Sequence, residues 1–209
     1  MKHAAVIDYG MGNISSVLNA CEHVGIEARL TKAHNEIRDA AGIILPGVGA
    51  FGDAMDALEG AGLVEIIQSE VSSGKPFMGM CLGMQLIATK GTEFGERSGI
   101  GLIDGAVERL DVSGAVSRTT LPHIGWNTVT FQRSDGMFAG LGDSADFYFV
   151  HSFALRPKEP SIIAGLCDHG ETFVAAIESD NVWAAQFHPE KSQKSGLALM
   201  ANWREKLLC

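Results

Sequence analysis

A cysteine lies between two glycines in the stretch 79–83, which reads Gly-Met-Cys-Leu-Gly. The apolar residues before it predict a strand, and residues 84–88 after it predict a helix. In this context Gly-x-Ser-x-Gly is a nucleophile elbow, whose glycines allow a sharp turn and close backbone packing. Here Cys81 replaces the serine, and the helix N-terminus favours its thiolate. The pattern predicts a cysteine nucleophile; a buried structural cysteine is the alternative.

A thiol nucleophile needs a base, and His188 stands apart among the seven histidines. It follows the apolar run 182–187 and precedes Pro189 and Glu190. The proline keeps the chain extended, so Glu190 can turn back to one ring nitrogen and leave the other for sulfur. The sequence therefore predicts a Cys-His-Glu triad, and a solvated loop histidine is the alternative reading of His188.

Acyl chemistry also needs hydrogen-bond donors for an oxyanion. The elbow offers the backbone N–H of Leu82. The loop 46–49, Pro-Gly-Val-Gly, ends an apolar run and offers a second donor at Gly49, although such a sequence is often only a turn. Because glycines flank Val48, a peptide unit of this loop can rotate at low steric cost, so the N–H of Gly49 can point into the site or away from it. The loop is therefore predicted to be an on/off switch for the second donor.

The elements that must position these residues alternate between strand and helix in the first half of the chain. Apolar runs predict strands at 3–8, 26–31, 42–45 and 75–78. Helices are expected along a stripe of Ile14, Val17, Leu18 and Cys21 and at about 58–72. This alternation predicts an α/β fold with a parallel sheet covered by helices.

The second half of the chain predicts mostly strands joined by turns rich in Gly, Asp, Asn and Ser. The strands are expected at 102–112, 123–131, 145–153, 161–167, 173–178 and 182–187. A closing helix from about Ser192 would turn Leu197, Met200, Trp203 and Leu207 inward. The parallel sheet is therefore expected to continue into antiparallel strands.

The composition limits the class of protein. With 209 residues, 46% apolar and 20% charged, the sequence predicts one globular domain over residues 1–209. The net charge of −9 gives no sign of a nucleic-acid-binding face, and no apolar run is long enough to span a membrane. The widely spaced Cys21, Cys81, Cys167 and Cys209 argue against a zinc site or a disulfide framework and favour reduced thiols in the cytoplasm.

A nucleotide-binding module is the rival function, because Gly-Met-Gly at 10–12 follows the first predicted strand. The third glycine of the dinucleotide fingerprint would fall at Ser15, and the second strand ends without the acidic residue that holds a ribose. Gly-Lys at 74–75 continues with proline, so no Walker loop is present. These departures disfavour the rival.

The elbow at Cys81, the sequence His-Pro-Glu at 188–190 and the loop 46–49 together resemble the class I, or triad, glutamine amidotransferases. Further stretches resemble one branch, the glutaminase subunits of histidine biosynthesis. They are Ile-Asp-Tyr-Gly-Met-Gly-Asn at 7–13, Leu-Pro-Gly-Val-Gly-Ala-Phe at 45–51, Pro-His-Ile-Gly-Trp-Asn at 122–127 and Phe-Tyr-Phe-Val-His-Ser-Phe at 147–153. The resemblance runs from residue 6 to about residue 203. The first and third stretches argue against the glutaminase of anthranilate synthase, the closest alternative.

The resemblance implies a flavodoxin-like, mainly parallel sheet flanked by helices, with additional antiparallel strands in the C-terminal half. It implies that L-glutamine is the substrate, that Cys81 forms a glutamyl thioester, and that Glu190 orients the acid/base His188. It further implies substrate contacts, which are Gln85, Glu93 at the α-amino group, and the backbone around His151 and Ser152 at the α-carboxylate.

The resemblance also implies a partner, a separate (β/α)₈-barrel cyclase subunit that receives ammonia through a tunnel. The cyclase would make imidazole glycerol phosphate and an aminoimidazole carboxamide ribonucleotide. Residues expected at or near the interface are Trp126, Asn127, Tyr148 and Lys191, the last close to the tunnel entrance. No metal, organic cofactor, nucleic acid or membrane is implied for this chain.

Overall fold

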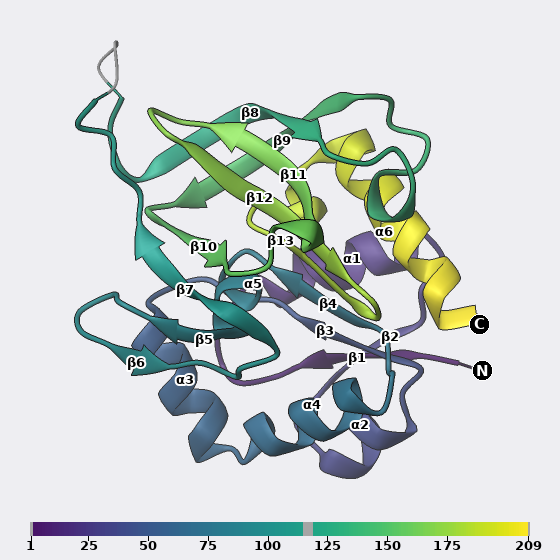
Figure 1. Cartoon of the computed structure of the whole chain (residues 1–209). Helices are drawn as coiled ribbons and strands as arrows, with labels where there is room; N and C mark the ends of the chain where they lie inside the picture. Colours follow the sequence, from purple (N-terminus) through teal and green to yellow (C-terminus); the bar gives the residue numbers. More distant parts are fainter. Residues whose placement is uncertain (1, 115–118, 209) are drawn as a thin grey trace.

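A nine-stranded sheet forms the centre of the protein in the computed structural model, which describes residues 2–114 and 119–208 (Figure 1). In spatial order its strands are β2 (Ala28–Thr31), β1 (Ala4–Ile7), β3 (Gly42–Leu45), β4 (Phe77–Met80), β13 (Val182–Ala185), β12 (Thr172–Ser179), β11 (Ile163–Asp168), β8 (His123–Phe131) and β9 (Ser144–His151). The first five strands pair in parallel and the others antiparallel. The predicted parallel sheet with an antiparallel continuation is confirmed. Cys209 lies outside the described residues.

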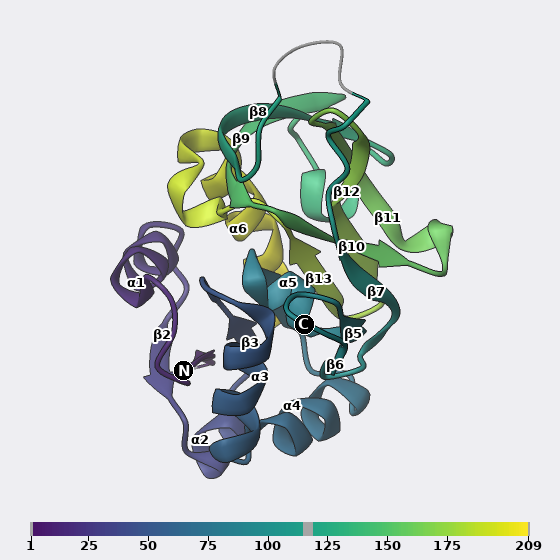
Figure 2. The ribbon, with the colours of Figure 1, turned by 90° about the vertical axis from the view of Figure 1, so that its left-hand side faces the viewer.

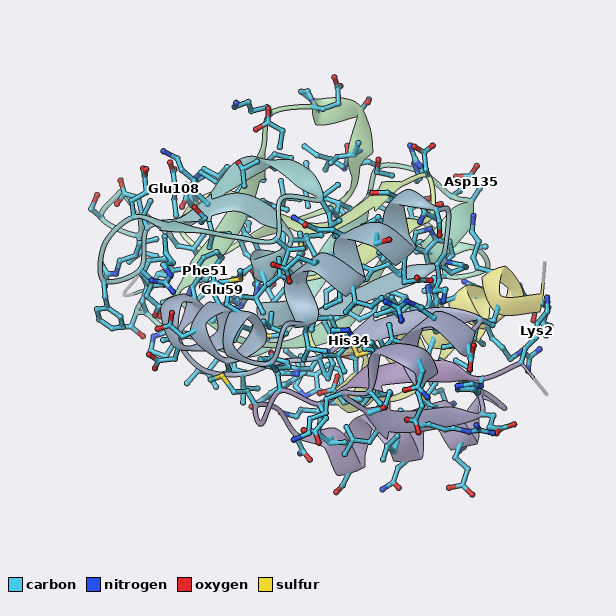
Figure 3. All side chains as sticks on the ribbon, turned by 90° about the horizontal axis from the view of Figure 1, so that it is seen from below. Lys2, His34, Phe51, Glu59, Glu108 and Asp135 are labelled. Atoms are coloured by element: carbon cyan, nitrogen blue, oxygen red, sulfur yellow. The ribbon has the colours of Figure 1, made fainter. Side chains whose placement is uncertain are left out.

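Helices cover both faces of the parallel strands, which explains why β1, β3, β4 and β13 are buried along their whole length (Figure 2). Side chains that point to one face pack with α1 (Ile14–His23) and α6 (Gln193–Leu208). Those on the other face pack with α2 (His34–Asp39), α3 (Phe51–Gly60) and α4 (Leu63–Ser72). Exposed charged side chains, among them Lys2, Glu59, Glu108 and Asp135, lie on the outer surface (Figure 3).

The single helix predicted at about 58–72 is wrong. The segment contains the end of α3 and the whole of α4, which are separated at Gly62 in the left-handed conformation (φ 65°). Glycine adopts this left-handed backbone without steric cost, which explains why the break falls at Gly62. In the closing helix Met200, Trp203 and Leu207 are buried as expected, but Leu197 is only half-buried.

A second sheet, not separately predicted, stands beside α5 (Leu82–Leu86). Its strands in order are β10 (Phe153–Pro157), β7 (Ile103–Arg109), β5 (Ala88–Gly91) and β6 (Arg97–Ser98). The helix predicted over 84–88 therefore ends at Leu86. The strand predicted over 145–153 ends at His151, and after Ser152 the chain leaves one sheet for the other.

Short 3₁₀ helices complete the described chain: η1 (Gly136–Phe138), η2 (Pro160–Ile162) and η3 (Pro189–Lys191). The last of these contains Glu190 of the predicted triad and begins directly after His188. None of the helices in the described part of the chain has the length and apolar character needed to cross a membrane.

Candidate active site

Cys81 occupies a strained turn between β4 and α5, with φ 53° and ψ −107°. Its N–H donates to the carbonyl oxygen of Ala185 at 2.8 Å, which ties the turn to β13. A Cβ on Gly83 would overlap the carbonyl oxygen of Leu45, and one on Gly79 would lie 2.9 Å from the carbonyl oxygen of Gly83. Both glycines are therefore needed for close packing, as the elbow motif predicted.

His188 and Glu190 form a buried pair beside this turn. The Nδ1 atom of His188 lies 2.7 Å from Oε1 of Glu190, and each side chain is 3% exposed. Burial lowers the pKa of His188, but the neighbouring Cys81 and Glu190 together raise it to about 9. Because this pKa lies above neutrality, the imidazole is a cation at neutral pH, and Nε2 bonds to no residue of the described chain.

Ser192 holds the backbone of His188 in place, a contact that the sequence did not predict. Its buried hydroxyl donates to the carbonyl oxygen of His188 at 2.6 Å and accepts the N–H of Tyr148 at 3.0 Å. The N–H of His188 in turn donates to the carbonyl oxygen of Tyr148 at 2.9 Å. These bonds join η3 to β9, so the backbone of Tyr148 positions the imidazole. In the sequence, the only sign of this contact is that Ser192 lies four residues after His188.

A cavity of about 300 Å³ opens beside Cys81 at the carboxyl ends of the parallel strands. Most of the predicted reaction and substrate residues line it, namely Gly49, Cys81, Leu82, Gln85, Glu93, His151 and Ser152. The structure thus brings together residues from α5, from the end of β9 and from the loops that hold Gly49, Glu93 and Ser152. His188 and Glu190 lie outside the lining.

Two predicted substrate contacts also have partners within the protein. Gln85 uses Nε2 to donate to the carbonyl oxygen of Phe153 at 2.9 Å and to Oε1 of Gln186 at 3.1 Å. One oxygen of Glu93 accepts the N–H of Phe51 at 2.8 Å, which satisfies a donor at the start of α3. Each side chain still has an oxygen that accepts nothing from the described residues and can receive a donor from a ligand.

The oxyanion loop, residues 46–49, is braced by the first strand-to-helix loop. The buried hydroxyl of Tyr9 donates to the carbonyl oxygen of Pro46 at 2.8 Å. The N–H of Leu82 donates to the carbonyl oxygen of Gly47 at 3.4 Å, and Gly49 has φ 113°. The structure therefore shows the predicted Leu82 donor already engaged within the protein.

Neighbouring residues on β8 differ in exposure, although both are predicted near an interface. Trp126 is 49% exposed, and its ring meets the edge of Tyr148 at a centroid distance of 6.1 Å. Asn127 instead points inward, where Nδ2 bonds to Nε2 of His123 at 3.2 Å and to the carbonyl oxygen of Asp168 at 2.8 Å. Lys191 is half-buried directly after Glu190.

Two buried histidines, His123 and His151, contact each other where β9 ends at the cavity. The sequence predicted a role for His151 but not for His123. Nδ1 of His123 lies 3.1 Å from Nε2 of His151, whose Nδ1 lies 2.9 Å from the carbonyl oxygen of Phe153. Burial, together with neighbouring histidines, lowers the pKa of His123 to about 3 and that of His151 to about 4. Both rings are neutral at pH 7, so a carbonyl acceptor sets the tautomer of His151.

Comparisons with known proteins identify the family of the chain. The family described as glutamine amidotransferase class-I matches residues 5–205. The chain is 46% identical to the imidazole glycerol phosphate synthase subunit HisH of Syntrophotalea carbinolica, over 95% of this chain and 97% of the relative. It is 46% identical to the subunit of that name from Aquifex aeolicus, with 96% and 95% covered. The HisH subunit of Geobacter sulfurreducens is 44% identical, with 98% and 99% covered.

Solved structures show the same fold. A glutamine amidotransferase crystal structure matches with a TM-score of 0.75 at 18% identity, over 98% of this chain and 99% of the other. PurLQS from Thermotoga maritima matches with a TM-score of 0.72 at 22% identity, over 100% and 98%. The flavodoxin-like fold predicted for the family is therefore confirmed. From the family match and the relatives together, the chain belongs to the class I glutamine amidotransferases and, within them, to the family of imidazole glycerol phosphate synthase subunit HisH.

Proposed function

We propose that this protein hydrolyses L-glutamine through a thioester on Cys81, as the glutaminase subunit of imidazole glycerol phosphate synthase in histidine biosynthesis. The match of residues 5–205 to one family supports a single glutaminase domain over the chain. The observation that carries the catalytic proposal is the arrangement at the elbow. A cysteine in a strained turn lies beside a histidine whose pKa is raised to about 9 by that cysteine and by Glu190.

In the first step the Cys81 sulfur attacks the carboxamide carbon of glutamine, and an S–C bond forms. The tetrahedral intermediate collapses as the C–N bond breaks, and His188 gives its proton to the leaving ammonia. Water then attacks the thioester, with His188 accepting one of its protons, and the S–C bond breaks to release glutamate and the cysteine. Glu190 holds the imidazole in the orientation that both proton transfers need.

The cavity suggests how glutamine is held. Glu93 lines the same cavity as Cys81 and keeps one carboxylate oxygen that Phe51 does not use, which suits the substrate α-amino group. The backbone at His151 and Ser152 would receive the α-carboxylate, and the open oxygen of Gln85 would accept a donor from the substrate. Gly49 and Leu82 would supply the oxyanion donors after the oxyanion loop releases the N–H of Leu82.

The ammonia is proposed to pass to a (β/α)₈-barrel cyclase subunit, which makes imidazole glycerol phosphate and an aminoimidazole carboxamide ribonucleotide. The relatives are subunits of a synthase, which implies a second subunit. Trp126, Asn127, Tyr148 and Lys191 are proposed to lie at or near the contact with the cyclase. A cytoplasmic location belongs to the same proposal and is supported by the free thiols of the described cysteines.

The test compares two ammonia sources in the assembled complex with the barrel subunit. Cys81→Ala should lower glutamine-dependent synthesis by at least about 10³-fold, since nucleophile deletions have effects of this size. Synthesis from added ammonium salt should survive, because that ammonia bypasses the glutaminase. The control Cys167→Ala removes a buried thiol in β11 and should retain both activities. Loss of both activities in Cys81→Ala would overturn the proposal.

A further inference from the structure

Two buried glutamine side chains form a hydrogen-bonded chain that ends at the reactive sulfur. Gln186 follows β13 directly and is fully buried. Its Nε2 lies 3.9 Å from Sγ of Cys81, within hydrogen-bonding reach of sulfur, and its Oε1 faces Nε2 of Gln85 at 3.1 Å. Gln186 does not line the substrate cavity. Its contact with the sulfur therefore points to a role other than substrate binding.

The carbonyl oxygen of Phe153 determines which end of each amide faces its neighbour. A carbonyl oxygen only accepts, so Gln85 must present its amide nitrogen there, at 2.9 Å. The second N–H of that nitrogen then points to Gln186, which must answer with its oxygen. The nitrogen of Gln186 is consequently left facing the sulfur. If the Gln186 amide were flipped, its nitrogen would face Nε2 of Gln85, and two donors would lie opposite each other.

The same carbonyl oxygen also accepts from Nδ1 of His151 at 2.9 Å, so both of its lone pairs are occupied. Gln85 therefore cannot be displaced from Phe153 without leaving a buried amide donor unpaired, which is costly. The hydrogen bonds between α5, β10 and the residue after β13 therefore fix the orientation of the two amides.

The sulfur of Cys81 has contacts that favour different protonation states. The carbonyl oxygen of Val150, at 3.9 Å, can only accept, so it favours the thiol S–H. An amide N–H favours the thiolate, because a hydrogen bond to a charged acceptor is stronger than one to a neutral acceptor. Gln186 adds no charge of its own, and its buried dipole acts in a medium of low dielectric.

We propose that Gln186 is a catalytic residue whose amide N–H donates to the Cys81 thiolate, and that Gln85 is a positioning residue that turns this N–H toward the sulfur. The inference rests on the nucleophilic role of Cys81 proposed above. His188 then supplies charge and the transferable proton, while Gln186 supplies a fixed dipole that no proton transfer removes.

The test measures alkylation of Cys81 by iodoacetamide in the full-length protein between pH 5 and 9, with the adduct located by mass spectrometry. Gln186→Met keeps the length of the side chain and removes the donor. It should slow alkylation at pH 6 about 10- to 100-fold and move the pH midpoint upward by at least about one unit. In the complex, kcat for glutamine should fall with little change in KM. The exposed control Gln132→Met should behave like the wild type.

A second variant, Gln85→Met, tests the inference if Gln186→Met does not fold. Gln85→Met leaves Gln186 in place but frees its amide to rotate, so alkylation should slow by a smaller factor. Because iodoacetamide is not recognised as glutamine, a substrate-binding role of Gln85 alone predicts no change in this rate. Folded variants that alkylate like the wild type would overturn the inference. A wild-type protein that neither alkylates at Cys81 nor hydrolyses glutamine would instead overturn the proposed function.

Discussion

The backbone N–H of Leu82 donates to the carbonyl oxygen of Gly47 at 3.4 Å, so a predicted oxyanion donor is engaged by the loop that should supply the other donor. The loop must move before Leu82 can face developing charge. One such donor is worth about 2.7–4 kcal/mol, or roughly 10²–10³ in rate. We therefore expect glutaminase activity to depend on the state of the oxyanion loop. Turning the Gly47–Val48 peptide would release the N–H of Leu82, and turning the Val48–Gly49 peptide would aim the N–H of Gly49 at the charge.

Gly49→Pro tests that dependence. Proline fixes φ near −65°, far from the 113° of Gly49, and removes the N–H. Partner-stimulated glutaminase should fall at least about 10²-fold, while Cys81 should still react with a small alkylating reagent. The assay needs a correctly assembled complex, checked by size-exclusion chromatography. Full stimulated activity would mean that the second donor comes from elsewhere.

Gly47→Ala should act mainly on packing, and not merely on the orientation of the loop. Its Cβ would overlap the hydroxyl of Tyr9 and lie 3.1 Å from Cβ of Leu82. Such overpacking costs about 1–3 kcal/mol of unfolding free energy. Tyr9→Phe removes the overlapping oxygen, so the double variant should lose less stability than the two single losses added together. Strict additivity in denaturant titrations would contradict this contact.

Glu93 combines two roles that different substitutions separate. Glu93→Gln keeps an oxygen for the N–H of Phe51 but removes the charge, so KM for glutamine should rise about tenfold or more with kcat and melting temperature little changed. Glu93→Ala should raise KM as much and also lower the melting temperature, because it leaves the start of α3 without this acceptor. Unchanged KM in both variants would exclude contact with the substrate amine.

The raised pKa of His188, which lies beside Cys81 and Glu190, predicts a loss of stability at alkaline pH. Folding raises the pKa of His188 from 6.5 to about 9, so the folded protein holds a proton that the unfolded chain has released. The imidazolium therefore stabilises fully below pH 6.5, and this contribution is lost as the pH rises toward 9. Unfolding free energies at pH 6, 7.5 and 9 should fall less steeply in Glu190→Gln than in the wild type. The exposed control His34→Gln should keep the wild-type slope, and equal slopes in all three proteins would contradict the assignment.

Trp126 and Asn127 are adjacent but should respond in opposite ways to truncation. Trp126→Ala removes an exposed ring, so it should weaken co-purification with the barrel subunit while the melting temperature stays nearly constant. Asn127→Ala leaves Nε2 of His123 without its donor and should cost about 1–3 kcal/mol of stability. Weak binding with full stability in Asn127→Ala would show that its inward contacts matter little.

Local patterns were enough to predict much of the fold. The strands at 42–45 and 123–131 have the predicted bounds, because alternating or continuous apolar runs directly reflect which faces are buried. The break between α3 and α4 was missed, because an amphipathic stripe can continue across two consecutive helices. The change of sheet at Ser152 was also missed, since the choice of strand partner depends on distant segments.

For the site, the sequence by itself determined the elbow and the His-Pro-Glu turn, because glycine, proline and a two-residue spacing act through local sterics. Only the tertiary structure decided which donor meets which acceptor. The contacts of Tyr9 with Pro46, of Ser192 with Tyr148 and of Gln186 with Cys81 join residues 37, 44 and 105 positions apart. A hydrogen bond requires two groups within about 3 to 4 Å, and chain separation carries no information about that distance until the sheets are assembled.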